Sequence, residues 1–125
     1  MVFLYSVHTD HAGHKYKWMS QEYIHSIEEA DIEIGKFIDK MKQENLYDET
    51  HFMFLTDHGG IEYGHGGVST DEMVVPWGIT GPHIAKGMKM KEANNTVNTA
   101  SVILHLFEVE QPLCWTGEVP TSIFK

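Results

Sequence analysis

The chain has 125 residues, of which 42% are hydrophobic and 22% charged, so it can form one small domain with a packed core rather than a disordered segment or a coiled coil. Its formal net charge of −9, from nine basic and eighteen acidic residues, excludes a protein that binds the nucleic-acid backbone through a basic patch. A single cysteine, Cys114, excludes an internal disulfide, whereas nine histidines are a large number for this length.

No apolar run is long enough to cross a membrane, which takes about 20 residues. The two longest runs are Met1–Val7 and Met73–Ile79. The first lacks a basic segment before it and a cleavage site of small residues after it, so we predict no signal peptide in this chain.

The first half of the chain is predicted to form a strand and a long helix. Residues 2–7 (VFLYSV) are β-branched and aromatic, as in a buried strand, and the polar stretch HTDHAGH after them indicates a loop. Ser20 is the predicted N-cap of a helix from Gln21 to about Glu44, in which apolar residues recur at three- and four-residue steps. Asn45 lies where this helix is expected to end.

The second half is predicted to hold two further strands, a loop and a short helix. In chain order these are strand 51–56, glycine-rich loop 57–71, strand 73–80 and helix 99–107. Pro76 indicates an edge or a bulge in the third strand, and Asn98 is the predicted cap of the short helix. The tail from Glu110 is irregular, with room for one more short strand.

A strand, a long helix and a second strand make one βαβ crossover, so the first two strands are expected to be parallel. We therefore predict a single α/β domain over residues 1–125, with a mostly parallel sheet flanked by helices. Three or four strands with two helices would leave one sheet face poorly covered. Such an exposed apolar face favours self-association.

Similar chemistry follows the first two predicted strands. Asp10 and His14 come after the first, and Asp57, His58 and His65 come after the second. Ligands gather at the carboxyl ends of parallel strands, so these five side chains are expected to lie close together. Carboxylates with neutral imidazoles suit Zn²⁺, Mn²⁺ or Fe²⁺ better than Ca²⁺. Taken singly, Asp10 and His14 also fit an Asx-turn and a surface histidine, and an Asp-His pair in a turn is commonly solvated.

The glycines around His65 support a ligand site. They allow the backbone to fold tightly and to approach a ligand, although a flexible loop would have the same composition. These glycines are Gly59, Gly60, Gly64, Gly66 and Gly67. Of the remaining histidines, His8 and His11 are the ones expected to contact the metal ligands and orient them without binding the ion themselves. A Walker A motif, G-x-S-x-G and H-E-x-x-H are all absent.

Three motifs follow one another in the chain: D-x-x-G-H in "DHAGH", D-H-G in "TDHGG" and G-H-G in "GHGG". Together and in this order they resemble the alkaline phosphatase superfamily, in its nucleotide pyrophosphatase/phosphodiesterase-like and sulfatase-like branch. The segments "VPWGITGPHIAKG" and "NTASVILHLFEVEQPLCWTGEVP" support the resemblance, which covers nearly the whole chain.

The resemblance implies two metal ions, usually zinc, about 4 Å apart, which together clamp a substrate during displacement at phosphorus. Asp10, His14 and His65 would hold one ion, and Asp57 and His58 would hold the other. Manganese or iron remains an alternative to zinc.

The chain departs from the family in lacking two groups that precede D-x-x-G-H in relatives. These are an aspartate on an earlier strand and a Thr or Ser nucleophile at a helix start, so no catalytic nucleophile is assigned here. The chain resembles the C-terminal half of such an enzyme. Lys17 stands where many relatives have glycine. Many relatives are exported to the periplasm or beyond the cell, and an export signal would lie in the upstream half.

The resemblance therefore implies a metal-dependent hydrolase of phosphate esters that acts on a small-molecule substrate. A sulfatase or a phosphosugar mutase could use the same scaffold. Two alternatives outside catalysis are an inactive metal-binding module and an assembly module that joins a partner supplying further strands.

Overall fold

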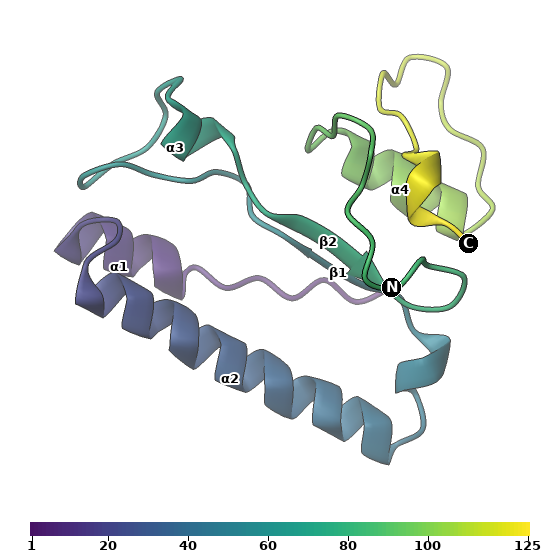
Figure 1. Ribbon diagram of the computed structural model, residues 1–125, viewed down its shortest axis with the longest axis horizontal. Helices are drawn as coiled ribbons and strands as arrows, with labels where there is room; N and C mark the ends of the chain where they lie inside the picture. Colours follow the sequence, from purple (N-terminus) through teal and green to yellow (C-terminus); the bar gives the residue numbers. More distant parts are fainter.

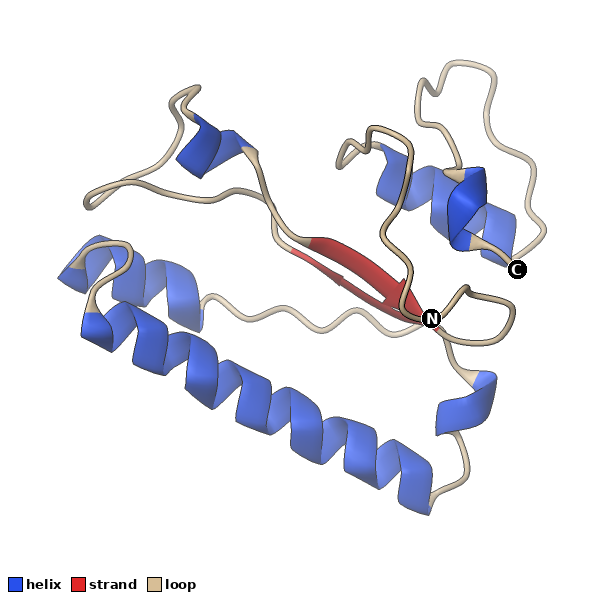
Figure 2. Ribbon diagram, in the orientation of Figure 1, coloured by secondary structure: helices blue, strands red, loops and turns tan.

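A computed structural model describes residues 1–125, the whole chain, as a mixed α/β arrangement (Figures 1 and 2). Two helices form one side, a two-stranded sheet crosses the middle, and a small C-terminal unit completes the structure. The elements are α1 (His8–Tyr16), α2 (Gln21–Gln43), η1 (Tyr47–Glu49), β1 (Phe52–Leu55), α3 (Thr70–Met73), β2 (Trp77–Thr80), α4 (Asn98–Leu106) and η2 (Thr121–Ile123).

The long predicted helix is confirmed as α2, which runs beside α1 (Figure 1). Ser20 is its N-cap, and the hydroxyl oxygen accepts a hydrogen bond of 3.1 Å from the backbone N–H of Tyr23. The helix ends at Gln43, and Asn45 follows with φ 57°, a left-handed conformation that asparagine tolerates. Local capping chemistry therefore defines both ends of α2.

The stretch HTDHAGH was predicted to be a loop, but in the structure it forms most of helix α1. Gly13 suggested a loop, since glycine has low helix propensity. In the structure its missing side chain makes room for a neighbour: a Cβ on Gly13 would lie 2.7 Å from the Trp18 ring. The helix places Asp10 and His14 four residues apart, on one face of α1.

The predicted mostly parallel sheet is wrong. The only sheet is antiparallel, with β1 paired to β2 so that Phe52 lies opposite Thr80 and Leu55 opposite Trp77. Residues 2–7 form no strand, and Val2 and Phe3 are each 78% exposed. An apolar, β-branched run has strand propensity but does not specify its partner. Here the loop and α3 bring the chain back beside β1 in the opposite direction.

The C-terminal elements differ from the prediction mainly at their ends. The third predicted strand is shortened to β2, with Pro76 directly before it. The short helix is confirmed as α4, but Asn98 is its first helical residue and not its cap. The Asn98 side chain instead accepts a hydrogen bond of 2.9 Å from the backbone N–H of Glu118. That contact joins the C-terminal tail to α4.

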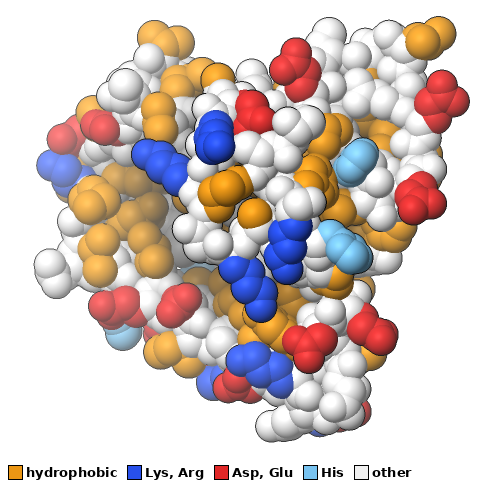
Figure 3. All heavy atoms as spheres, turned by 45° about the vertical axis from the view of Figure 1, so that its right-hand side comes forward, with side chains coloured by type: hydrophobic (Ala, Val, Ile, Leu, Met, Phe, Trp, Pro, Cys, Tyr) orange, Lys and Arg blue, Asp and Glu red, His pale blue; other side chains and the backbone are white.

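The buried core is small. Ten of the 125 residues are buried, and only five of these are hydrophobic: Ala12, Trp18, Ile84, Val102 and Ile123. Figure 3 shows apolar side chains gathered in patches among charged ones on one face of the molecule. None of the helices combines the length and the apolar character that crossing a membrane would require.

The glycine-rich loop after β1 is fastened to α3. The backbone N–H groups of Gly59 and Gly60 donate to the carbonyl oxygens of Glu72 and Asp71, at 2.8 and 3.0 Å. A Cβ on Gly59 would lie 2.0 Å from the Asp71 carbonyl oxygen, so only glycine fits this approach. The Glu72 carboxylate accepts hydrogen bonds from the Gly67 N–H and the Ser69 hydroxyl, at 2.7 and 2.6 Å. These contacts give the loop a defined shape.

Lys17 has a backbone conformation that suits glycine. Its φ of 84° and ψ of 138° lie in a region that residues with a Cβ rarely adopt. Its ammonium group pairs with the Glu62 carboxylate at 2.8 Å, and this hydrogen bond raises the pKa of Lys17. The turn between α1 and α2 is therefore strained at Lys17.

We expect Lys17→Gly to be more stable than Lys17→Ala by about 1 kcal/mol, because both variants lose the Glu62 ion pair and only glycine relaxes the backbone. Urea unfolding at neutral pH measures the difference. Equal midpoints for the two variants would contradict strain at this position.

The Glu72 contacts predict a pH dependence of stability. Hydrogen bonds from Ser69 and then Gly67 lower the pKa of Glu72 below its ordinary value of 4.5. A carboxylate whose pKa is lower in the folded state stabilises the fold above its unfolded pKa, and this contribution disappears as the pH falls through the folded pKa. We expect Glu72→Gln to melt below the wild type at pH 7, and the gap to narrow between pH 5 and pH 3. A gap that stays constant over this range would rule out a titrating Glu72.

Candidate metal centre

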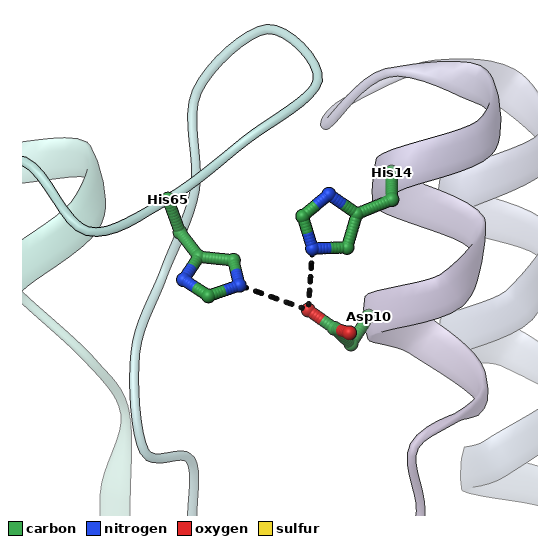
Figure 4. A group of neighbouring side chains, drawn as sticks. All are labelled: Asp10, His14 and His65. Atoms are coloured by element: carbon green, nitrogen blue, oxygen red, sulfur yellow. Dashed lines mark ion pairs between the residues drawn. The ribbon is translucent and has the colours of Figure 1, made fainter.

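The site lies between α1 and the glycine-rich loop (Figure 4). α1 presents Asp10 and His14 from one face, one turn apart, and the loop presents His65 toward them. His58 follows β1 and reaches the same place, since its imidazole stacks on that of His65 with ring centroids 3.7 Å apart. Four of the five ligands predicted from sequence thus come together from two segments that are distant in the chain.

The Asp10 carboxylate lies at the centre of this group. Its Oδ1 atom is 3.5 Å from His14 Nε2 and 3.6 Å from His65 Nε2. The ligand atoms of these three residues all lie within 4.8 Å of one another. Around a tetrahedral zinc ion with bonds of about 2.0–2.1 Å, neighbouring ligand atoms are about 3.3 Å apart. The two distances from Asp10 Oδ1 to the imidazole nitrogens are therefore close to the spacing that one such ion requires.

Asp10 Oδ1 is buried and has no hydrogen-bond partner. A buried carboxylate oxygen without a partner is costly, because it has lost water and gained nothing in exchange. The atoms that surround it are imidazole nitrogens, which are the usual companions of a carboxylate around a metal ion. The donor set fits a transition-metal ion.

Backbone carbonyls orient two of the imidazoles. His14 Nδ1 lies 2.8 Å from the carbonyl oxygen of Tyr63, and His58 Nδ1 lies 2.8 Å from that of Gly59. A carbonyl oxygen only accepts, so each Nδ1 carries the proton and donates. Each Nε2 then keeps its lone pair and faces the Asp10 carboxylate. Histidine ligands of metal ions are commonly held in this way.

Asp57 and His58 lie at the outer side of the group. His58 Nε2 is 3.9 Å from Asp10 Oδ1 and 3.7 Å from Asp57 Oδ2. The Asp57 side chain is 75% exposed, whereas the side chains of Asp10 and His58 are each 29% exposed. His58 thus lies between the Asp10 carboxylate and the exposed Asp57 carboxylate.

The two histidines expected to support the ligands do not do so. His8 faces α2, where its Nε2 pairs with a Glu29 carboxylate oxygen at 3.0 Å. The His11 side chain is exposed and makes no hydrogen bond or ion pair; only its backbone N–H donates, to the Val7 carbonyl oxygen at 3.1 Å. The supporting groups are instead the Tyr63 and Gly59 carbonyls, which the sequence could not indicate because any residue carries a carbonyl.

Sequence reasoning also missed Trp18. It is 7% exposed and contacts both His14 and His65, with ring centroids 5.0 and 6.0 Å apart. An apolar side chain just after D-x-x-G-H gave only a weak signal, because a tryptophan near a helix end is ordinary core material. Its contacts with two ligands appear only in the tertiary structure.

Known proteins with similar sequences carry names from phosphoester chemistry. GPI ethanolamine phosphate transferase 1 of Saccharomyces cerevisiae is 35% identical over 80 residues, which cover 61% of this chain and 9% of that protein. Venom phosphodiesterase 2 of Crotalus adamanteus is 38% identical over 56 residues, covering 45% of this chain and 7% of that protein. An uncharacterised pyrophosphatase/phosphodiesterase of Schizosaccharomyces pombe is 36% identical over 59 residues, covering 47% and 12%. The chain thus spans a small part of the length of these relatives.

A family profile gives the broader match. The profile for type I phosphodiesterase / nucleotide pyrophosphatase matches residues 1–105, which include every residue of the candidate centre. No solved structure matches the chain. The resemblance to the alkaline phosphatase superfamily is confirmed: the chain belongs to the type I phosphodiesterase / nucleotide pyrophosphatase family.

Proposed function

We propose that the chain forms part of the zinc centre of a hydrolase of phosphate esters, similar to phosphodiesterases and acting on a small-molecule substrate. The observation that carries this proposal is the buried, unpaired Asp10 Oδ1, which imidazole nitrogens surround at 3.5 and 3.6 Å. Family membership supports it, as do the names of relatives that transfer ethanolamine phosphate or cleave phosphodiesters.

The charge of the chain also favours a metal ion. A phosphate ester is an anion, whereas the chain has a formal net charge of −9. It also contains no arginine that could bind a phosphate through bidentate hydrogen bonds. Lys17, which directly follows α1, is already paired with Glu62. Divalent cations at the centre would neutralise both Asp10 and the substrate.

In this proposal Asp10, His14 and His65 hold one zinc ion, and Asp57 and His58 contribute to a second. Bound zinc ions would stabilise the negative charge that develops on the phosphoryl oxygens. The Tyr63 carbonyl keeps His14 Nε2 directed at the centre through its hydrogen bond to Nδ1. The exposed position of Asp57 leaves its carboxylate accessible from the solvent side.

The nucleophile is proposed to come from outside these 125 residues. No hydrogen bond of Asp10, His14, His58 or His65 involves a serine or threonine hydroxyl. The Ser69 hydroxyl, which belongs to the same loop region, donates to Glu72 instead. The chain supplies metal ligands, and a Thr or Ser elsewhere would attack phosphorus.

The first prediction from this function concerns metal content. After dialysis against zinc, the chain is expected to retain about one tightly bound ion by elemental analysis, since one set of three ligands is well formed. His14→Ala/His65→Ala should retain none. The control His8→Ala/His25→Ala also removes two imidazoles, but ones that pair with Glu29 and Glu28 outside the centre. Equal zinc in all three proteins would contradict the assignment.

The second prediction concerns turnover. The chain alone is expected to hydrolyse bis(p-nitrophenyl) phosphate no faster than zinc in buffer, because no serine or threonine hydroxyl is hydrogen-bonded to the proposed ligands. Release of p-nitrophenolate, followed by its absorbance, measures this. Zinc-dependent turnover that His65→Ala abolishes would instead show that this chain contains its own nucleophile.

A further inference from the structure

Trp18 lies in the short turn from α1 to α2, yet it is among the most buried residues, at 7% exposure. Its backbone N–H donates a hydrogen bond of 2.8 Å to the carbonyl oxygen of Glu62. Glu62 precedes Tyr63, whose carbonyl holds His14. The backbone of Trp18 is therefore fastened to the same tight turn that orients one of the ligands.

The indole ring separates α1 from the glycine-rich loop. A Cβ on Gly13 would lie 2.7 Å from Cδ2 and Cε2 of the ring, and a Cβ on Gly60 would lie 2.1 Å from Cε2. Two backbones that approach the same ring bond this closely must do so from different sides. No side chain larger than hydrogen fits at either position without moving the ring or the backbone.

The edges of the indole reach the ligands themselves. Trp18 meets His14 at an interplanar angle of 87° and His65 at 71°, both edge-to-face arrangements. His14 belongs to α1 and His65 to the loop, so one ring contacts a ligand from each segment. The centroids of the two imidazoles are 5.0 Å apart.

Trp18 also connects the site to α2. Its ring lies 6.0 Å from that of Tyr23. Burial raises the pKa of Tyr23. The indole thus contacts α1, α2 and the loop, in a protein with only five buried hydrophobic residues.

We propose that Trp18 is a positioning residue that sets the distance between α1 and the glycine-rich loop, and thereby the spacing of Asp10, His14 and His65 at the metal centre. This inference rests on the proposed zinc function. A side chain that only filled the core would affect the stability of the fold without a specific effect on metal affinity. A side chain that spaces the ligands affects affinity even when the fold is intact.

The test compares two identical substitutions in the same loop. Gly60→Ala places a methyl group against the Trp18 ring, whereas a Cβ on Gly64 meets no atom within 4 Å. Zinc affinity is measured by competition with a chromophoric chelator, and folding by far-ultraviolet circular dichroism. We expect Gly60→Ala to weaken zinc binding about tenfold or more, as mutations of the groups that orient metal ligands commonly do. Gly64→Ala is expected to leave zinc binding unchanged.

A second substitution tests whether the effect passes through Trp18. Leu has no atoms at the ring positions Cε2 and Nε1 that a Cβ on Gly60 would meet, so Trp18→Leu should relieve the overlap created by Gly60→Ala. The double variant is expected to bind zinc more tightly than Gly60→Ala alone. Should Gly60→Ala lose its helical signal, Trp18→Leu replaces it, with the same tenfold weakening expected in a folded protein.

The outcomes separate the two proposals. If the wild type binds no zinc, the proposed function fails and this inference falls with it. If the wild type binds zinc and His65→Ala does not, the centre stands. Gly60→Ala with wild-type affinity, a double variant no better than Gly60→Ala, or folded Trp18→Leu with wild-type affinity would then each overturn the positioning role of Trp18.

Discussion

The buried carboxylate oxygen of Asp10 is the constraint on which the centre depends. It has no hydrogen-bond partner, and imidazole nitrogens of His14 and His65 lie 3.5 and 3.6 Å from it. For His14 the Tyr63 carbonyl fixes the proton on Nδ1, so the lone pair of Nε2 is directed at an anionic oxygen. Two electron-rich groups held face to face are unfavourable unless a proton or a metal cation lies between them. The surrounding structure keeps the carboxylate and the imidazoles in these positions and supplies no hydrogen-bond donor to Asp10 Oδ1.

That arrangement needs rigid support from both sides, and the structure provides it by packing and by hydrogen bonds. On one side, the helical geometry of α1 fixes Asp10 and His14 one turn apart. On the other, Glu72 and the backbone of α3 fasten the glycine-rich loop that carries His65. The Trp18 ring fills the space between them. The glycines thus serve close packing as much as flexibility, because Gly59, Gly60 and Gly13 each lie where a Cβ would collide with a neighbour.

The fold around the centre buries little apolar surface. Only five hydrophobic residues are buried, and the N-terminal residues Val2 and Phe3 remain largely in solvent. Metal binding contributes folding free energy in small domains, since the ligands are not preassembled in the unfolded chain. The centre joins residues from positions 10 to 65, so metal binding and the folding of this half of the chain are expected to depend on each other.

The sequence by itself determined those features that depend on local chemistry. The Ser20 cap, the apolar periodicity and Asn45 are enough to define α2, because capping and periodicity act within a few residues. The family resemblance of the motifs was enough to select Asp10, His14, His58 and His65 as neighbours, although the parallel strands expected to bring them together do not form. Only the tertiary structure decided that β1 pairs with β2, that D-x-x-G-H is helical, and that Trp18 contacts two ligands. Strand partners and ring contacts join residues far apart in the chain, and local propensity carries no information about which distant segment arrives there.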